Sequence, residues 1–203
     1  MEKYSPSVKW QIDNLTKTLS IASNFVSEST IASIINVIIA NSELHIYSVH
    51  KLFIAVRNNY ANQEALVKVA VYTLGELGDL LLKNPISGPD DEIITVTEKD
   101  LVDLFRTLLE QRFFDTSVKE YILNAILKIS NKLNVGVQAK EEFIALNDSQ
   151  KTAFDSEIQQ RANEYSLFHV FVKEEMRYQI TANIPVHKFY KENEVKKYFF
   201  ILI

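Results

Sequence analysis

The sequence predicts an all-α protein in which antiparallel helix pairs stack into an α-solenoid. Apolar residues recur at helical spacing along most of the 203 residues, and only 4 Gly and 4 Pro interrupt them. The candidate helices fall in pairs, which begin near positions 8 and 28, 43 and 63, 97 and 115, and 137 and 150. Pair-to-pair intervals of roughly 35 to 55 residues are typical of HEAT- and armadillo-like repeats. This spacing also fits a compact helix bundle.

The stretch from Asn62 to Leu82 organises the chain, and Asn62 is the expected N-cap of its helix. Its polar side chains share one narrow stripe: Glu64, Lys68, Tyr72, Glu76 and Asp79. Nearly everything else in it is apolar, so other helices must cover most of its circumference. Gly75 and Gly78 each cost about 1 kcal/mol of helix propensity, which indicates close approach of a neighbouring helix.

Three helices are expected before this one. The first runs from Ser7 to Phe25, and the second follows a cap at Ser27 and ends near Ala40. The third begins at Asn41 and Ser42. The first helix places Trp10, Leu15 and Leu19 at the start of the stack, where no earlier helix covers what they leave exposed.

A break follows the organising helix. Residues 83–96 contain Pro85, Gly88 and Pro89 with an acidic run and no helical period, so we expect an exposed loop and no sheet. Thr97 and Asp100 then resemble a capping box.

The remaining expected helices run from Thr97 to about Arg112, from Asp115 to Leu133 and from Gly136 to Leu146. The last one is capped by Asp148 or Ser149, includes Phe154 on its periodic face, and ends near Ile180. Pro185 ends regular structure. The final run, Tyr198 to Ile203, is uncharged and β-prone, so it must pack or remain an aggregation hazard.

The chemistry-bearing residues do not form a catalytic, metal or cofactor motif. With 0 Cys and 4 His, of which His45 and His50 lie five apart, neither a thiolate site nor a helical metal pair is expected. The net charge of −4 argues against a general nucleic-acid binder. No segment has the length of a membrane span or the pattern of a signal peptide. Carboxylates with Lys partners, such as Glu64 with Lys68, are interpreted as solvated faces.

Three segments carry a resemblance to a known family. The order and spacing of these segments agree with those of the family. The segments are residues 58–81 (NNYANQEALVKVAVYTLGELGDLL), residues 154–165 (FDSEIQQRANEY) and residues 41–47 (NSELHIY). They resemble the trunk of clathrin adaptor large subunits of the gamma-adaptin type. Leu77 departs from the pattern, because gamma-adaptins tend to have an aromatic residue there. The residues that match most specifically are Gly75, Glu76, Gly78, Asp79, Gln159, Gln160, Arg161, Glu164 and Tyr165.

The resemblance implies a non-enzymatic scaffold in a heterotetrameric adaptor, with a beta-type large chain and medium mu-type and small sigma-type chains as partners. It implies a cytoplasmic location, peripheral on trans-Golgi network, endosomal and clathrin-coated vesicle membranes, and a role in protein transport between these compartments. Residues 1–186 are expected to form a later part of the trunk, and residues 187–203 a divergent tail.

No catalytic, cofactor-binding or metal-binding residue is carried over from the family. Gln159, Gln160 and Arg161 are candidates for hydrogen bonds between helices, and tying helix ends is preferred to direct partner recognition. The alternatives are a generic helical-repeat scaffold, such as a nuclear-transport-like protein, and an alpha-adaptin-type endocytic adaptor.

Overall fold

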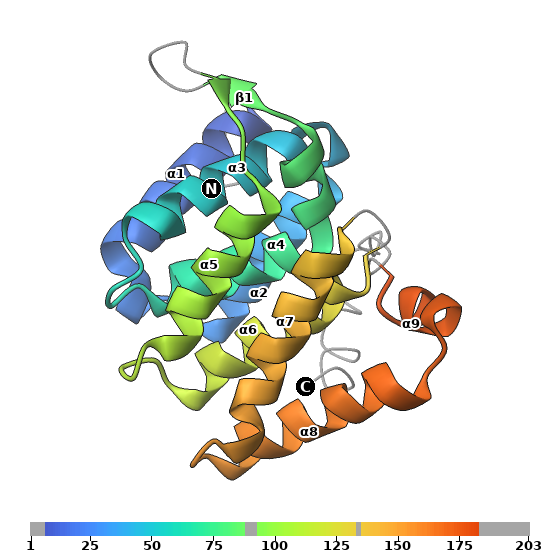
Figure 1. Cartoon of the computed structure of the whole chain (residues 1–203). Coiled ribbons are helices and arrows are strands. Elements are labelled where there is room, and N and C mark those ends of the chain that lie inside the picture. The colour runs from blue at the N-terminus through green and yellow to red at the C-terminus, as the bar shows by residue number, and fades with distance from the viewer. Residues whose placement is uncertain (1–6, 88–92, 133–134, 183–203) are drawn as a thin grey trace, which may run out of the picture.

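The computed structural model describes residues 7–87, 93–132 and 135–182. Within these ranges it consists of α-helices joined by short 3₁₀ turns and one minimal β pairing (Figure 1). The helices are α1 (Val8–Ala22), α2 (Glu28–Ala40), α3 (His45–Asn58), α4 (Glu64–Lys83), α5 (Glu98–Glu110), α6 (Thr116–Ser130), α7 (Val137–Ser149), α8 (Ser156–Phe171) and α9 (Glu174–Ile180). The predicted all-α class of stacked helices is therefore confirmed.

Helix α4 lies at the centre of the stack, as its apolar circumference predicts. It packs most extensively against α6 and α3, and also against α1 and α2. Fourteen of its 20 residues are buried, including Lys68 and Glu76 from the polar stripe. A second contact layer is formed by α5 and α7, where the rings of Phe105 and Phe143 meet edge to face at 5.8 Å. One hydrophobic core extends from α1 to α8.

Several helix starts agree with the local sequence. The Ser7, Ser27 and Asp115 side chains each accept a hydrogen bond from a backbone N–H in the first turn of the helix that follows. Thr97 and Asp100 form a complete capping box, in which each side chain bonds the other residue's backbone N–H.

The expectation that Asn62 caps α4 is wrong. Asn62 adopts a left-handed conformation with φ of 57°, and α4 begins two residues later with no side-chain cap from Gln63. The free N–H groups of the first turn are satisfied across the fold instead. The Ser23 hydroxyl, from the 3₁₀ turn Ser23–Phe25, accepts hydrogen bonds from the Ala65 and Leu66 amides at 2.8 and 3.3 Å. A contact over 42 residues of sequence replaces a local one.

The expectation of a loop without sheet between α4 and α5 is also wrong. Strands β1 (Ile86–Ser87) and β2 (Ile93–Ile94) pair antiparallel, with Ile86 opposite Ile94 and Ser87 opposite Ile93. Isoleucine, the residue at positions 86, 93 and 94, has a high β propensity, which agrees with the pairing. The acidic run from Asp90 to Glu92 lies outside the described residues.

The C-terminal helices begin and end differently from the prediction. Helix α7 continues to Ser149 and a 3₁₀ turn, Gln150–Thr152, follows it, so Asp148 and Ser149 do not cap the next helix. Asp155 caps α8, and Phe154 is fully exposed. The chain then breaks at Val172 and Lys173 before α9, which lies at the right of the view in Figure 1. Pro185 and the tail from 187 to 203 lie outside the described residues.

None of the described helices alone has the length and apolar content needed to cross a membrane. The segments Glu28–Ala40 and Ser42–Asn58 pass the same test only as a pair, bent by 91° at the break between them. Their apolar side chains belong to the hydrophobic core, as Ile31, Ile38, Leu52 and Phe53 show.

Candidate functional site

The first signature segment, Gly75 to Asp79, lies on α4 where that helix crosses α6. A Cβ atom on Gly75 would lie 3.1 Å from the Cα atom and 3.2 Å from the Cβ atom of Ala125. The same atom on Gly78 would meet Ile129 and Leu101 at 3.8 and 3.9 Å, which is ordinary contact distance. Gly75 therefore permits the close approach of α4 and α6 that the sequence predicted, and Gly78 packs at normal separation.

The acidic residues of this segment, Glu76 and Asp79, form contacts between α4 and the C-terminal part of α6 and the residues that follow it. Glu76 is buried, and one of its carboxylate oxygens accepts a hydrogen bond from the Lys128 ammonium of α6. The Lys132 ammonium donates to the Glu76 backbone carbonyl at 2.5 Å and lies 3.6 Å from an Asp79 carboxylate oxygen. Burial lowers the pKa of Lys132, although Asp79 and Glu76 oppose the shift. Burial also raises the pKa of Tyr72, one turn before Glu76.

The interpretation of this stripe as a solvated face does not hold. Lys68 is only 4% exposed, and its ammonium donates a hydrogen bond to Glu28 of α2 at 2.7 Å instead of pairing with Glu64. The reason is that α4 is covered on the side that carries Lys68, so the ammonium needs a partner on the covering helix. The polar stripe of α4 thus joins that helix to α2 on one side and to α6 on the other.

The second signature segment, Gln159 to Tyr165, lies on α8, which packs against α6 and α7. The Arg161 guanidinium bonds Glu157 of its own helix at 2.8 Å, donates to the Asn124 side-chain oxygen of α6 at 3.3 Å, and lies 3.8 Å from a Glu120 carboxylate oxygen. The Tyr165 hydroxyl donates to the same Asn124 oxygen. Arg161 and Tyr165 therefore tie α8 to α6.

The other polar members of this segment do not join helices. The Gln160 amide donates to Glu164 at 2.8 Å on the exposed side of α8, and the Gln159 side chain is also exposed. A contact between helices that the sequence did not indicate comes from Asn147 of α7, whose buried amide donates to the Ala162 carbonyl at 2.9 Å.

Helix α6 links the two signature segments, which do not meet in one cleft. Its residues Ala125 and Lys128 face α4, as does Lys132 just after the helix, and Glu120 and Asn124 face α8. Sequence reasoning missed these α6 residues. The available signal was Lys128, which lies between the apolar residues Leu127 and Ile129. In the described part of the chain, no group of His, Asp or Glu is arranged to hold a metal ion.

The polar side chains of the two signature segments that are not exposed form hydrogen bonds and ion pairs between helices. Comparison with known proteins agrees with it: a model of the adaptin N-terminal region matches residues 1–170. The chain belongs to the adaptin family.

Individual adaptins show the same relationship. The chain is 38% identical over 167 residues to the AP-1 complex subunit gamma-1 of Arabidopsis thaliana, which covers 82% of this chain and 18% of the relative. It is 31% identical over 188 residues to the human AP-1 complex subunit gamma-like 2, covering 91% of this chain and 23% of that protein. The gamma-1 subunit of Mycosarcoma maydis is 30% identical over 167 residues. This adaptin chain spans about a fifth of the length of these relatives.

Proposed function

We propose that this adaptin chain is a non-enzymatic scaffold segment of a gamma-type large subunit in a clathrin-associated adaptor complex. The observation that carries the proposal is the use of the buried charges on α4. Lys68 and Glu76 are both buried and pair with neighbouring helices. Ion pairs between neighbouring helices fix the helices of the stack relative to one another. A scaffold requires such a fixed arrangement. The gamma subunit names of the relatives support the assignment of type.

The partners that we propose are a beta-type large chain, a medium mu-type chain and a small sigma-type chain. Support comes from the ends of the helical stack, where large apolar side chains are exposed. Ile21 and Phe25 lie at the end of α1, with Phe25 92% exposed, and Phe171 and Phe154 lie at the two ends of α8. Contiguous exposed apolar surface marks interaction sites, and we infer that these side chains contribute to such surfaces.

We further propose that the assembled complex acts in vesicle-mediated protein transport between the trans-Golgi network and endosomes. In this role the chain is cytoplasmic and reaches the membrane only through the complex. We assign residues 1–186 to the adaptin trunk and residues 187–203 to a divergent tail. The support for these points is family membership and the end of the matched region at residue 170.

Co-expression of the tagged chain with a beta-type trunk, a mu-type chain and a sigma-type chain tests the proposal. We expect the four chains to purify together, and we expect the Ile21→Ser/Phe25→Ser variant to recover less of at least one partner. Lys17→Ser, at an exposed polar position of the same helix, is the matched control. Failure of wild type to retain any of the three chains would reject the adaptor assignment.

The same purification separates the alternatives. Recovery of alpha-type complex partners in preference to gamma-type ones would favour an endocytic adaptor. Recovery of nuclear-transport cargo with no adaptor chain would favour a generic helical-repeat scaffold.

A further inference from the structure

The imidazole of His169, near the end of α8, contacts α6 through one ring nitrogen and α9 through the other. Its Nε2 atom lies 3.3 Å from the Ser130 hydroxyl oxygen, and its Nδ1 atom lies 3.0 Å from a guanidinium nitrogen of Arg177. The same guanidinium nitrogen donates a hydrogen bond to the His169 backbone carbonyl at 3.1 Å. His169 therefore joins the end of α8 to both α6 and α9.

The hydrogen bonds around His169 fix which ring nitrogen carries the proton. A guanidinium can only donate, so the Nδ1 atom that faces Arg177 must accept. The Ser130 hydroxyl donates its single proton to the Leu127 carbonyl at 3.0 Å, so its oxygen accepts from Nε2. Both contacts require the neutral imidazole with its proton on Nε2. A second proton can be added only at Nδ1, where the Arg177 N–H already points.

Helix α9 has little attachment of its own to the helices beside it. None of its seven residues is buried. Within the described residues, the other polar contact that links it to a neighbouring helix is the ion pair of Glu174 with Lys140 of α7, at 3.6 Å. Thr181, directly after α9, is buried, but its hydroxyl donates to the Arg177 carbonyl and so stays within this segment. The position of α9 therefore depends on the contact between Arg177 and His169.

We propose that His169 is a pH-sensitive switch that releases α9 from α8 when its imidazole takes up a second proton. The added proton lies on Nδ1, so Arg177 loses this acceptor, and its guanidinium then faces an imidazolium of the same charge. The pair of Glu174 with Lys140 remains, but the Glu174 side chain is exposed, and exposed ion pairs contribute little to stability.

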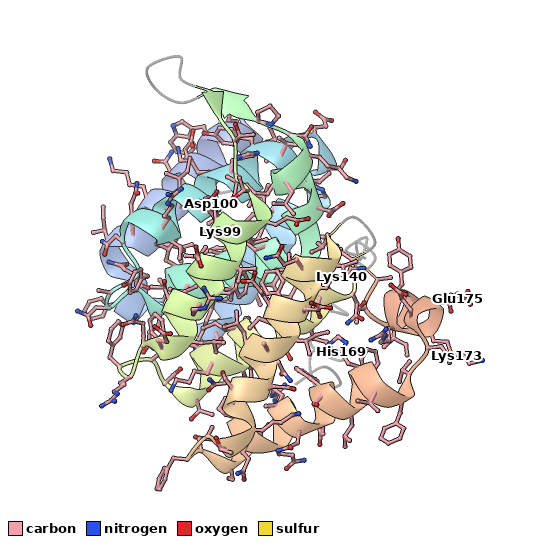
Figure 2. All side chains as sticks on the ribbon, in the orientation of Figure 1. Lys99, Asp100, Lys140, His169, Lys173 and Glu175 are labelled. Atoms are coloured by element: carbon pink, nitrogen blue, oxygen red, sulfur yellow. The ribbon has the colours of Figure 1, made fainter. Side chains whose placement is uncertain are left out.

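The charged side chains on the surrounding elements leave this contact as the main one at the ring. Most of them already have partners: Lys128 and Lys132 with carboxylates of α4, Lys140 with Glu174, Asp148 with Lys151, and Glu157 with Arg161. Figure 2 shows His169 on the side of α8 toward Lys140, with Lys173 and Glu175 at the outer edge of α9.

The direction of the switch follows from these surroundings. Burial and Arg177 lower the pKa of His169, and Asp148 opposes them with a smaller effect. The ring is therefore neutral near pH 7, and it takes up a proton only as the pH falls below the ordinary histidine pKa of about 6.5. Release of α9 removes Arg177 from the ring, which brings the pKa of His169 back toward that ordinary value. Protonation and release therefore favour each other.

Distance measurements on the full-length chain test the switch. Because the chain has 0 Cys, spin labels can be attached selectively at Gln138→Cys on α7 and Gln179→Cys on α9, both exposed positions. Pulsed electron paramagnetic resonance then gives the distribution of distances between the two labels. We expect one narrow distribution at pH 7.5, and at pH 5 a rise of at least about threefold in the fraction of chains at other distances.

A second label pair, Lys99→Cys on α5 with Gln138→Cys, reports on the body of the stack. Its distance distribution should be the same at both pH values, because α5 and α7 are held by the hydrophobic core. An unchanged distance to α9 at pH 5 would overturn the proposal. So would an equal change in both label pairs, because the whole stack would then be opening.

Three variants assign the response to His169. His169→Asn keeps an oxygen for Arg177 but cannot titrate, so the distance to α9 should not depend on pH. Arg177→Ala removes the contact and should broaden the distribution already at pH 7.5. His45→Asn, a matched histidine replacement on α3, should respond to pH as the wild type does.

A wild-type pH response in His169→Asn, or a narrow distribution in Arg177→Ala, would show that other groups control α9. These measurements involve this chain alone and go beyond the scaffold role, so their failure would leave the proposed function standing.

Discussion

The Thr116 hydroxyl donates a hydrogen bond to an Asp155 carboxylate oxygen at 2.5 Å, across 39 residues of sequence. Asp155 is also the N-cap of α8, where its other oxygen accepts from the Glu157 and Ile158 amides. One carboxylate thus fixes the first turn of α8 and attaches it to the first turn of α6. The hydrogen bonds from Thr116 and from these amides lower the pKa of Asp155.

Asp155→Ala should therefore destabilise the chain and fray the first turn of α8, because it removes the cap and the link to α6 together. Asp155→Asn is the matched control, since its side-chain oxygen can still accept one of these bonds. Thermal unfolding with hydrogen exchange at residues 156–160 measures both effects. Similar behaviour of the alanine and asparagine variants would contradict this role for Asp155.

The two glycines of α4 should respond differently to substitution. Gly75→Ala places a Cβ atom 3.1 Å from the Ala125 backbone, so α6 must shift and stability should fall. Gly78→Ala meets neighbours at 3.8 Å or more and should be neutral or stabilising by up to about 1 kcal/mol. Gly78→Leu should cost about 1–3 kcal/mol by overpacking. Urea melts give the free energy of unfolding of each variant, and equal stability of the two Gly78 variants would show that this position tolerates bulk.

Removing Glu76 should destabilise the contact between α4 and α6. Glu76→Leu leaves Lys128 without its carboxylate, and because the Lys128 side chain is 21% exposed, the loss should be smaller than the about 3–5 kcal/mol that is typical of a fully buried pair. The double variant Glu76→Leu/Lys128→Met should recover much of this loss, because neither charge then remains. Arg106→Ala, which removes exposed pairs with Asp103 and with Glu142 of α7, is the control and should change the unfolding free energy by no more than about 1 kcal/mol. Additive effects of the Glu76 and Lys128 substitutions would mean that the pair is not coupled.

Stability should fall as the pH is lowered from 7.5 to 5. Burial and the neighbouring Arg177 lower the pKa of His169, against a smaller opposing effect of Asp148, and burial also lowers the pKa of His50. The folded state therefore binds fewer protons than the unfolded state near pH 6. The contribution of these histidines to folding stability is complete above the histidine pKa of the unfolded chain, about 6.5. It is lost as the pH falls from there through the lowered histidine pKa values of the folded chain.

The contribution of His169 can be isolated by replacing it with asparagine. Asparagine offers an oxygen to Arg177 without titrating, so His169→Asn should reduce the pH dependence of the urea midpoint and leave the part due to His50. An unchanged pH dependence would show that His169 is protonated equally in the folded and unfolded states.

Sequence periodicity predicted the helices well because burial imposes it directly. The largely covered circumference of α4, the capping box at Thr97 and the close approach at Gly75 were each indicated by residues near one another in the chain. What sequence reasoning missed depends on contacts over long separations. The Ser23 hydroxyl, and not the Asn62 side chain, accepts hydrogen bonds from the first turn of α4. The Lys68 ammonium pairs with Glu28, and not with Glu64. Neither contact can be predicted without knowing how the segments before α4 pack against it.

The candidate site was predicted in part for the same reason. Arg161 was identified as a residue that joins helices, but its partner Asn124 carries no pattern of its own in the sequence. Gln160 fits the same motif and yet points outward, because the face that it occupies is not covered by another helix in the described residues.

The position of α6 between α4 and α8 restricts which kinds of genetic change this segment can accept. Glu120 and Asn124 are in register with α8, and Ala125 and Lys128 are in register with α4. One codon inserted after Asn124 would turn everything downstream by about 100°, so one set of contacts would be lost whichever neighbour kept its alignment. Substitutions can be accommodated here one at a time, but a change in length cannot. Divergence between relatives should therefore proceed through α6 by replacement, with insertions and deletions confined to the connections on either side.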